Sequence, residues 1–535
     1  MKKYRKIFLF GILPALFYLA FFVFYTWPWT THFSSAFFAD TGDGLQNVWN
    51  LWWVNFAVQH QQNIYFTNFL HFPGGTTLLA QTLNPINGIF AVILLKFFSL
   101  VQSYNLIVIL AFVLTGLFTF WLAWEFSRSY IGGLLAGFAL TFSSYHFAHA
   151  IGHLNLITLE FIPLFLLCFW RLLKKPTIPL AIFSAVTLFL VEFSDLYYLI
   201  FCLIVAGIII IYLLVLRRLL WSNFAQKNYA IFVGLSALIV APLSLLIFFA
   251  NWRDTFLGVH KALEFSLDLP AAIIPGQIWH FAALTASYWT KNPLGIVEGS
   301  VSVGIIIWLA VLAAIFAYKK FRGSDLALWL WIFFIFGILS FGPRLQIGGK
   351  IVSDIPLPYS LATRILPFLN LGGTPVRMMV ISMLAGSLVL AIVVGKIQTK
   401  KISGKIILFL IFALMFVELW PAKLPLTKAA APDFVQKLAE LPAGAVVDLL
   451  DTPTSALYFQ TIYQKPLVGG YISRLPTSVS EKDAAIFNLI DEKNYSALRN
   501  QYQIRYLIFP AVTDSSGLPS PIYRDQTAAI YDLDR

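Results

Sequence analysis

The sequence predicts a helical protein that crosses a membrane many times and ends in a small α/β domain outside it. Of its 535 residues, 59% are hydrophobic and only 12% are charged, which is more apolar side chain than a soluble globular protein can cover. The formal net charge of +12 comes from small basic clusters between apolar segments, a pattern typical of cytoplasmic loops rather than of nucleic-acid binding. The bilayer is therefore the main solvent of this chain.

The spans follow from matching apolar runs to the roughly 20 residues that a membrane helix needs. A basic start precedes the first apolar run, which ends near Tyr25, so we expect a retained first helix with a cytoplasmic N-terminus. The run Ile86–Leu100 is short and contains Lys96, and we interpret it as an amphipathic helix on the outer surface. With the next span at about 105–125, the later basic clusters all fall inside and about eleven spans result. These clusters are Arg128; Arg171, Lys174 and Lys175; Arg217 and Arg218; Lys319, Lys320 and Arg322; and Lys396, Lys400, Lys401 and Lys405.

An odd number of spans carries the end of the chain to the outer side. From about Lys423 the composition becomes ordinary, with strand-like runs at 445–450, 505–509 and 529–533 and helical runs near 433–440 and 495–502. We therefore expect a transmembrane domain over 1–422 and an extracytoplasmic α/β domain over 423–535. In the latter, the glycines and the aromatic residue of Lys465–Tyr471 suit sugar contact, but they are also typical of an ordinary turn, which we favour.

Polar residues gather in the predicted outer loops, above all in the first, at 26–104, which carries an acidic stretch. Loops that converge above a rigid bundle are a usual place for a binding or catalytic site. Two carboxylates three residues apart, Asp40 and Asp43, can hold a hydroxyl acceptor, one as general base and the other positioning the acceptor or a divalent cation. Alternatively, Asp43 only caps the helix that begins near it. We rank Asp40 first because it is freer to face a cavity.

The helix predicted from Asp43 has a polar face and an aromatic face. The polar face holds Gln46, Asn47 and Asn50, and the aromatic face holds Trp49, Trp52 and Trp53. We interpret it as an interfacial helix, with Asn47 and Asn50 available to bind substrate. The alternative is an ordinary aromatic belt at the headgroup level.

Further candidates lie in later outer loops. His146, His149 and His153 are three and four residues apart, a spacing that can hold zinc, although interfacial hydrogen bonding is the better-supported interpretation. Asp195 lies in a very tight turn between two predicted helices, where it either faces the same cavity as Asp40 or marks the membrane boundary.

Two outer-side cations suit a phosphate group. Arg344 and Arg377 each lie near a glycine and a proline, which can fix a guanidinium fork for bidentate phosphate binding. Headgroup contact without specificity is the competing interpretation. A metal requirement stays open, and no cofactor other than a candidate divalent cation is indicated.

The chain resembles the GT-C class of polytopic membrane glycosyltransferases, and within it the bacterial branch similar to lipoteichoic-acid glycosylation membrane proteins. The resemblance is carried by a first helix followed by a large outer loop with Asp-x-x-Asp, a many-helix bundle and an outer C-terminal domain. The supporting segments are Asp40–Asn50, Gly152–Asn155, Ser194–Tyr198, Phe341–Leu345 and Gly373–Arg377.

This resemblance implies an outer-face transferase of hexosyl or pentosyl groups, which takes the sugar from a polyprenyl-phosphate-linked donor and passes it to a cell-envelope glycan, lipid or protein. It also implies that Asp40 or Asp43 is the catalytic base or orients the acceptor. Two other classes stay open. A lipid or polysaccharide transporter or flippase predicts ionisable residues in mid-span or symmetry between two halves, and little of either is present. A noncatalytic membrane binding protein leaves the carboxylates dispensable.

Overall fold

The computed structural model describes residues 2–220, 226–292, 294–321, 324–366, 369–397, 401–450, 452–512 and 517–534. Arg322 and Lys400, which the sequence assigns to cytoplasmic clusters, lie outside these ranges. Within them, seven helices are long and apolar enough to cross a membrane: Tyr4–Tyr25, Leu100–Ser127, Tyr130–His149, Leu154–Lys174, Leu196–Val215, Lys227–Arg253 and Pro375–Val394. The chain is thus of the helical multi-pass class that its composition predicts.

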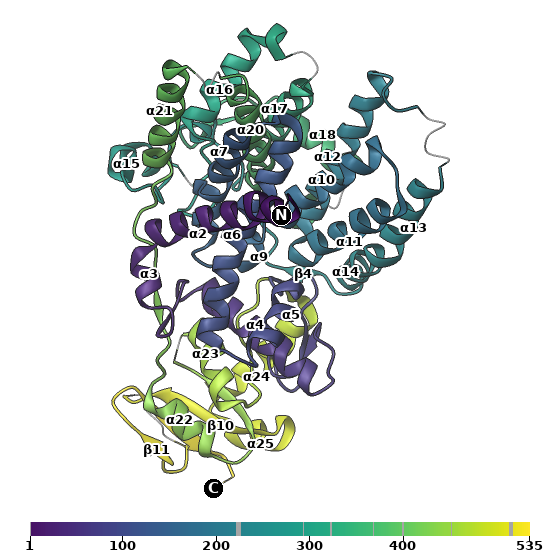
Figure 1. Ribbon diagram of the computed structural model, residues 1–535. Coiled ribbons are helices and arrows are strands. Elements are labelled where there is room, and N and C mark those ends of the chain that lie inside the picture. The colour runs from purple at the N-terminus through teal and green to yellow at the C-terminus, as the bar shows by residue number, and fades with distance from the viewer. Residues whose placement is uncertain are drawn as a thin grey trace.

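The helical part fills the upper half of Figure 1. Its N-terminal helix comprises α1 (Lys2–Ile7), a π-helical turn (Phe8–Ile12) and α2 (Leu13–Tyr25). The longer helices that follow are α6 (Leu100–Ser127), α7 (Tyr130–Thr141), α10 (Phe161–Lys174), α11 (Ile178–Ser194), α12 (Leu196–Val215), α13 (Lys227–Ile239), α14 (Ala241–Arg253), α16 (Ile305–Phe316), α17 (Leu326–Ser340), α20 (Met379–Val394) and α21 (Ile402–Glu418). Short helices connect them: α3 (Trp27–Thr31), α8 (Ser144–His149), α9 (Leu154–Ile157), α15 (Ala286–Trp289), α18 (Pro358–Ile365) and α19 (Leu369–Gly372).

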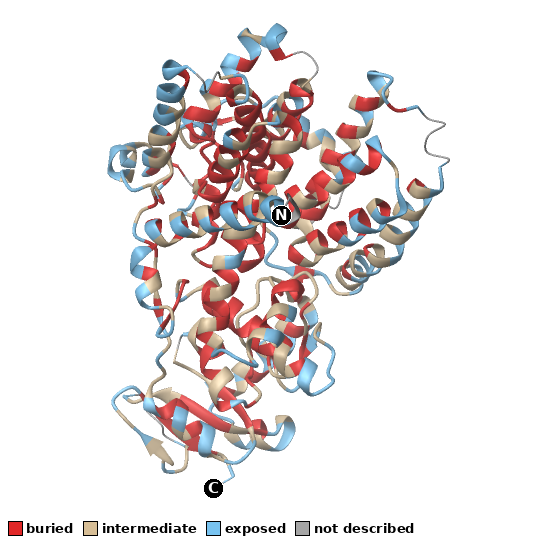
Figure 2. Cartoon of the chain, viewed as in Figure 1, coloured by how far each residue is buried: buried red, intermediate tan, exposed pale blue. Residues whose placement is uncertain are grey.

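The centre of the bundle is α20, which packs against α6, α7, α16 and α17. Nearly all of its side chains are buried, whereas α2, α13 and α21 at the periphery expose many of theirs (Figure 2). A helix that is apolar all round is buried in a bundle or faces lipid. The peripheral helices have this composition and an exposed face, so that face is the one for lipid.

One end of the bundle collects ion pairs from several of the predicted cytoplasmic loops. Glu125 contacts Arg128 at 3.1 Å and Arg171 at 2.9 Å, and Asp325 contacts Lys174 at 3.8 Å and also Arg218. Loops that the positive-inside pattern assigns to one side of the membrane therefore meet at one end of the molecule.

The chain after Lys423 forms a four-stranded sheet with helices at the lower end of Figure 1. The strand order is β11 (Tyr523–Arg524), β12 (Ala528–Asp532), β10 (Ile504–Pro510) and β8 (Ala445–Asp448), with β8 parallel to β10 and the other pairs antiparallel. The helices are α22 (Asp433–Glu440), α23 (Pro453–Tyr463), α24 (Thr477–Asp491) and α25 (Tyr495–Tyr502). The three strand runs and two helical runs predicted from periodicity are all present.

Short strand pairs lie outside this sheet. They are β1 (Ala36–Phe37) with β7 (Thr427–Lys428), β2 (Phe66–Thr67) with β3 (Thr76–Thr77), β4 (Phe256–Leu257) with β9 (Leu475–Pro476), and β5 (Gln346–Ile347) with β6 (Lys350–Ile351). Two of these pairs connect the C-terminal segment to loops of the helical part. The C-terminal segment is therefore held against the outer loops rather than suspended from one linker.

The first outer loop differs from its predicted arrangement in one respect. Its helix α4 (Asp43–Gln59) was expected at the membrane surface, but its tryptophans are buried, with Trp49 and Trp53 at 1% and 0% exposure. Helix α23 packs on α4, and Trp49 Nε1 donates to Gln460 Oε1 at 2.7 Å. The interfacial-helix and aromatic-belt interpretations of α4 are wrong because the C-terminal segment covers the aromatic face.

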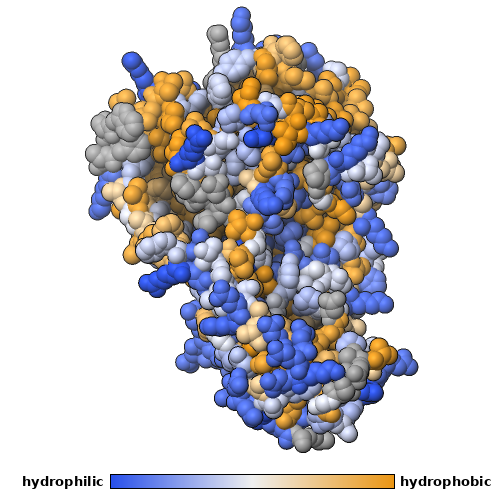
Figure 3. All heavy atoms as spheres, turned by 180° about the vertical axis from the view of Figure 1, so that it is seen from behind, coloured by the Kyte–Doolittle hydropathy of each residue, from blue (hydrophilic) through white to orange (hydrophobic). Residues whose placement is uncertain are grey.

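The second helix of this loop is too short to be a span, as predicted, but it ends at Leu94 rather than near Leu100. Helix α5 (Pro85–Leu94) has 10 residues, too few to span a bilayer, and exposes Ile89 and Ile93 while burying Ile86 and Ala91. Seen from behind, hydrophobic surface gathers over the helical part and hydrophilic surface over the C-terminal segment (Figure 3). This division matches a bundle in lipid and a terminal segment in water.

Candidate functional site

Asp40 binds the backbone at the start of α4. Its Oδ1 accepts hydrogen bonds from the amides of Gly42 at 3.1 Å and Gly44 at 2.9 Å, which occupies two of the free N–H groups of the helix N-terminus. Burial raises the pKa of the Asp40 carboxyl above its ordinary value; the two amides act against this rise and the nearby charge of Asp43 adds to it. Asp40, which the sequence ranks first, is therefore fixed by the backbone rather than free.

Asp43 makes side-chain contacts instead. The alternative interpretation, in which Asp43 only caps α4, is wrong because its carboxylate makes no capping bond. Its Oδ2 lies 3.1 Å from His153 Nε2, and its Oδ1 accepts the hydroxyl of Tyr471 at 2.8 Å. Burial raises its pKa, but the hydrogen bonds and charge of His153, the Tyr471 hydroxyl and the charge of Arg377 outweigh this and lower the pKa of Asp43 below its ordinary value.

The three histidines do not converge. Helix α8 ends at His149, so His153 lies beyond the helix and the three histidines do not share one helical face. His146 lies in the core between the carbonyls of Thr141 and Ile157, 2.8 and 2.9 Å away. His149 and His153 remain neighbours, with their Nδ1 atoms 3.4 Å apart. The structure thus brings His153 to Asp43 and leaves His146 in a core role.

Two glycines allow the acidic stretch to lie against the turn that carries His153. A Cβ at Gly152 would come 3.1 Å from Asp40 Oδ1 and 3.2 Å from Asp43 Cβ, and one at Gly44 would come 2.6 Å from Ala39 Cβ. The Asp40 amide also donates to the Ile151 carbonyl at 2.7 Å. The close backbone approach explains why glycine occupies both positions.

The two amides predicted to bind substrate hold the loop together. Asn47 Nδ2 donates to the carbonyls of Asp43 at 3.0 Å and Gly152 at 2.7 Å, while its buried Oδ1 has no partner among the described residues. Asn50 Nδ2 donates to the Thr82 carbonyl at 3.1 Å. Asn47 therefore ties α4 to the His153 turn, and Asn50 ties α4 to the chain before α5.

Asp195 lies between α11 and α12, in the one-residue turn that the sequence predicts. Its Oδ1 caps α12 through the amide of Tyr197 at 2.7 Å, and its Oδ2 accepts from Asn155 Nδ2 at 2.6 Å. The charges of Arg377 and His153 act on the carboxylates of both Asp195 and Asp43. Asp195 is thus fixed at the same end of the bundle, near the Asp43 site.

Arg377 is a buried cation at this end of the bundle. Its Nε and Nη2 donate to Glu298 Oε1 at 3.0 and 2.5 Å, and its guanidinium lies 5.0 Å from the ring centre of Tyr197. The Tyr197 hydroxyl in turn contacts Thr374 Oγ1 at 2.8 Å. Glu298 escaped the sequence analysis because no local pattern marks a partner 79 residues away.

Arg344, the other predicted phosphate ligand, lies in the exposed loop before β5. Its Nη1 contacts Asp354 Oδ1 at 2.8 Å, with side chains 46% and 90% exposed. Among the described residues, no hydrogen bond or ion pair joins Arg344 to Arg377 or to the carboxylates above. The segments that carry the two arginines do meet, since a Cβ at Gly342 would lie 3.1 Å from Pro375 Cγ.

Tyr471 is a second residue at this site that the sequence analysis did not identify. It ends the segment Lys465–Tyr471, which we interpreted as an ordinary turn, and it reaches Asp43 across 428 positions. Glycines at 469 and 470 have φ of +74° and +123°, so the segment is indeed tightly turned. The segment is a turn, as predicted, but the prediction did not include the contact between Tyr471 and Asp43.

The donor set around the two carboxylates does not fit a divalent cation. Asp40 Oδ1 accepts two amide N–H groups, and Asp43 faces an imidazole and a hydroxyl, whereas Mg²⁺ and Ca²⁺ need further oxygen ligands. Across the described ranges, no group of three or more His, Cys, Asp or Glu is placed to hold a metal ion. No chemical step below involves a metal.

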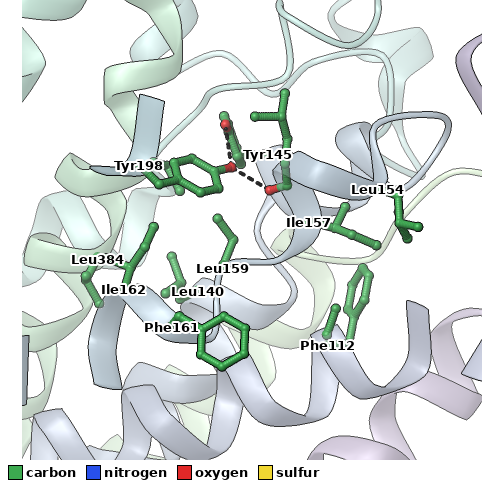
Figure 4. Packing of buried hydrophobic residues seen from close by; sticks show 14 of the residues in the cluster. Phe112, Leu140, Tyr145, Leu154, Ile157, Leu159, Phe161, Ile162, Tyr198 and Leu384 are labelled. Atoms are coloured by element: carbon green, nitrogen blue, oxygen red, sulfur yellow. Dashed lines mark hydrogen bonds between the residues drawn. The ribbon is translucent and has the colours of Figure 1, made fainter. Parts of the chain in front are cut away.

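The helices beneath the site are tightly packed. Figure 4 shows the hydroxyls of Tyr145 and Tyr198 turned toward each other, 3.0 Å apart, above the side chains of Ile162 and Leu384. Tyr198 also contacts the Leu156 carbonyl at 2.5 Å. This packing fixes the turn that carries His153 and the start of α12.

An apolar cavity of about 530 Å³ lies among α16, α17, α20 and the chain 267–274. The residues that line it include Trp308, Phe333, Val303 and Met379. Met379, at the start of α20, lines this cavity, whereas Arg377 is not among its lining residues.

Family models and curated proteins gave no match to this sequence. Among solved structures, the chain is similar to ArnT from Cupriavidus metallidurans bound to undecaprenyl phosphate, at 12% identity and TM-score 0.42, over 96% of this chain and 98% of that one. It is also similar to the archaeal oligosaccharyltransferase AglB from Archaeoglobus fulgidus in complex with an inhibitory peptide and a dolichol-phosphate, at 12% identity and TM-score 0.39, over 87% of this chain and 65% of that one. These identities and TM-scores are too low to transfer a family or an activity to this chain.

Proposed function

We propose that this protein is a GT-C-type glycosyltransferase that moves a sugar from a polyprenyl-phosphate-linked donor to a cell-envelope acceptor at the outer membrane face. The observation that carries the proposal is the Asp43 carboxylate. It is 31% exposed, is held by His153 and Tyr471, and has a lowered pKa. The lowered pKa makes this carboxylate a weaker base, but it keeps the group ionised, so it is oriented and open to accept a hydroxyl proton.

In the proposed reaction, Asp43 accepts the proton of the acceptor hydroxyl. The freed oxygen pair forms the bond to the anomeric carbon, while the bond from that carbon to the phosphate oxygen breaks and the polyprenyl phosphate leaves with its electron pair. A carboxylate has about four lone-pair sites, so contacts to His153 and Tyr471 leave room for the acceptor. The His153 ring, 18% exposed, is placed to contact substrate as well.

The other acidic residues have supporting roles in this proposal. Asp40 shapes the turn that presents Asp43, since it binds the amides on both sides of that residue. Asp195 holds Asn155 next to the His153 turn. Asn47 holds α4 against the His153 turn, and Asn50 holds α4 against the chain before α5.

Arg377 is the leading candidate for the donor phosphate, because it is the guanidinium whose charge reaches Asp43. Glu298 fixes its planar group in one orientation, which suits bidentate contact with phosphate oxygens. Arg344 is a second candidate, since about half of its side chain is exposed. The apolar cavity that begins near Met379 suits part of the polyprenyl chain.

The topology of the proposal has eleven spans. The seven long helices are joined by the shorter apolar helices α11, α16 and α17 and by α21. The ion pairs of Glu125 and Asp325 then lie on the cytoplasmic side with the N-terminus, and Asp43 lies outside with residues 423–535.

Transfer from defined donors tests the proposal. Protein in nanodiscs is given radiolabelled polyprenyl-phosphate sugars, and donor loss and labelled product are measured for wild type, Asp43→Asn and Glu125→Gln. We expect transfer by wild type and Glu125→Gln and a loss of about 10²–10⁴-fold for Asp43→Asn. Sugar-lipid crossing the bilayer without bond cleavage would favour a transporter, and binding without either event would favour a noncatalytic protein.

A further inference from the structure

The segment from Leu467 to Pro476 joins two outer loops, and we call it the 467–476 strap. At its beginning it pairs with the first outer loop: the amide of Leu467 donates to Phe69 at 2.8 Å, and the amides of His71 and Phe72 donate to Gly469 and Leu467 at 2.8 and 3.1 Å. These bonds resemble those of a short β-sheet. They place the tight turn at Gly469 and Gly470 directly against the first outer loop.

Two buried or partly buried glutamines hold the middle of the strap. Gln46 of α4 contacts the Tyr471 carbonyl at 3.4 Å, and Gln81 Oε1 accepts both the Ser473 hydroxyl and the Arg474 amide at 3.0 Å. Both glutamines belong to the first outer loop. The backbone on either side of Tyr471 is therefore fixed to the same loop that carries Asp43.

The end of the strap binds a different loop. Leu475 and Pro476 form β9, which pairs antiparallel with Phe256 and Leu257 of β4. Arg474 Nη1 also donates to the Gly258 carbonyl at 2.7 Å. The strap thus spans from the first outer loop to the long loop after α14, and Tyr471 lies at its centre.

We propose that the C-terminal segment is part of the site, because Tyr471 is a positioning residue that orients the Asp43 carboxylate and keeps it ionised. The catalytic part of this inference rests on the proposed function, whereas the contact between Tyr471 and Asp43 is independent of it. Tyr471 donates to Asp43 Oδ1 while His153 faces Oδ2, so the two contacts set the rotation of the carboxylate. A hydrogen bond donated to the charged form stabilises that form.

Removal of one hydroxyl tests this role. Tyr471→Phe keeps the ring and loses the donor, so the acidic limb of the pH profile of kcat/KM should move upward by about one pH unit, with roughly tenfold loss of rate below that limb. The matched control is Tyr458→Phe on α23, whose hydroxyl makes no hydrogen bond to the described residues and whose ring packs against Phe37. A Tyr471→Phe profile that superimposes on that of wild type would overturn the inference.

A second measurement does not need activity. Thermal unfolding of Asp43→Ala, Tyr471→Phe and the double variant gives their coupling, which is expected because contacting residues are non-additive. If wild type transfers no sugar from any donor, the proposed function fails, and coupling alone decides whether the strap fixes Asp43. Additive effects of the two substitutions would overturn the positioning role whatever the activity.

Discussion

The two ends of the helical bundle hold their carboxylates in opposite ways. At the proposed cytoplasmic end, Glu125 and Asp325 are 12% and 8% exposed, and each is neutralised by two cations. At the other end, Asp43 is 31% exposed and is held by an imidazole and a phenol. Arg377, whose charge acts on Asp43, has a carboxylate partner of its own in Glu298.

This difference distinguishes carboxylates that join loops from a carboxylate that can contact a substrate. A carboxylate that is paired with two guanidinium or ammonium groups serves to join loops. A carboxylate held by hydrogen-bond donors remains ionised, oriented and open on one side. The comparison therefore predicts that substitution of Asp43 lowers the reaction rate, whereas substitution of Glu125 leaves the rate unchanged.

The largest stability effect should come from the buried pair at the outer end. Arg377→Met leaves Glu298 as a buried charge without its partner, and breaking such a pair typically costs about 3–5 kcal/mol of unfolding free energy. Thermal unfolding in detergent or nanodiscs measures it. Lys at position 377 keeps the charge and should recover part of the loss. Equal stability of wild type and Arg377→Met would mean that the two outer-end residues do not form the pair described.

A smaller effect should follow from adding a methyl group beside the acidic stretch. Gly152→Ala places a Cβ 3.1 Å from Asp40 Oδ1 and the Gly44 amide, tighter than ordinary contact. We expect a loss of about 1–3 kcal/mol from overpacking, together with slower transfer because Asp43 moves with its loop. Gly207→Ala is the control, since nothing lies within 4 Å of a Cβ there. Similar behaviour of the two variants would contradict the close approach.

The Asp40 cap should have a modest effect with a distinctive pH dependence. Asp40→Ala loses the acceptor at the start of α4 and should cost about 1 kcal/mol, whereas Asp40→Asn keeps an acceptor. Burial raises the pKa of Asp40, so its titration contributes stability that is full below the unfolded carboxyl value of about 3.9 and is lost as pH rises through the folded pKa. Unfolding curves of wild type and Asp40→Asn across this range should converge at low pH. Parallel curves would rule out the raised pKa.

The smallest effect on rate is expected at the opposite end. Glu125→Gln leaves Arg128 and Arg171 partly exposed to solvent, so its cost in unfolding free energy should be about 1 kcal/mol or less and transfer should be unchanged. Parallel transfer and unfolding assays test both parts. A rate loss as large as that of Asp43→Asn would contradict the proposed difference between the carboxylates at the two ends.

Local patterns in the sequence were sufficient for much of the fold. Hydrophobic periodicity located α22 and α25 and the three long strands, and the length of the apolar run kept α5 out of the list of spans. The acidic stretch and His153 also stood out, because charged and imidazole groups beside membrane helices are unusual.

The remaining features depend on contacts between distant positions. The exchange of roles between Asp40 and Asp43 depends on the backbone at Gly42, whose φ and ψ of −91° and −117° turn the loop so that Asp40 meets the amides. The burial of Trp49 depends on α23, about four hundred residues later. Tyr471 belongs to the same category, since nothing near it in the chain resembles a partner for a carboxylate.

The pH dependence of transfer tests the central claim most directly, because Asp43 and His153 are both placed to act as the base. If Asp43 is the base, kcat/KM for the wild-type protein should stay constant from neutral pH down to about pH 4, since its pKa lies below the ordinary carboxyl value of about 3.9. An acidic limb near pH 6.5, the ordinary histidine value, that disappears in His153→Gln would assign the proton transfer to His153 and contradict the role proposed for Asp43.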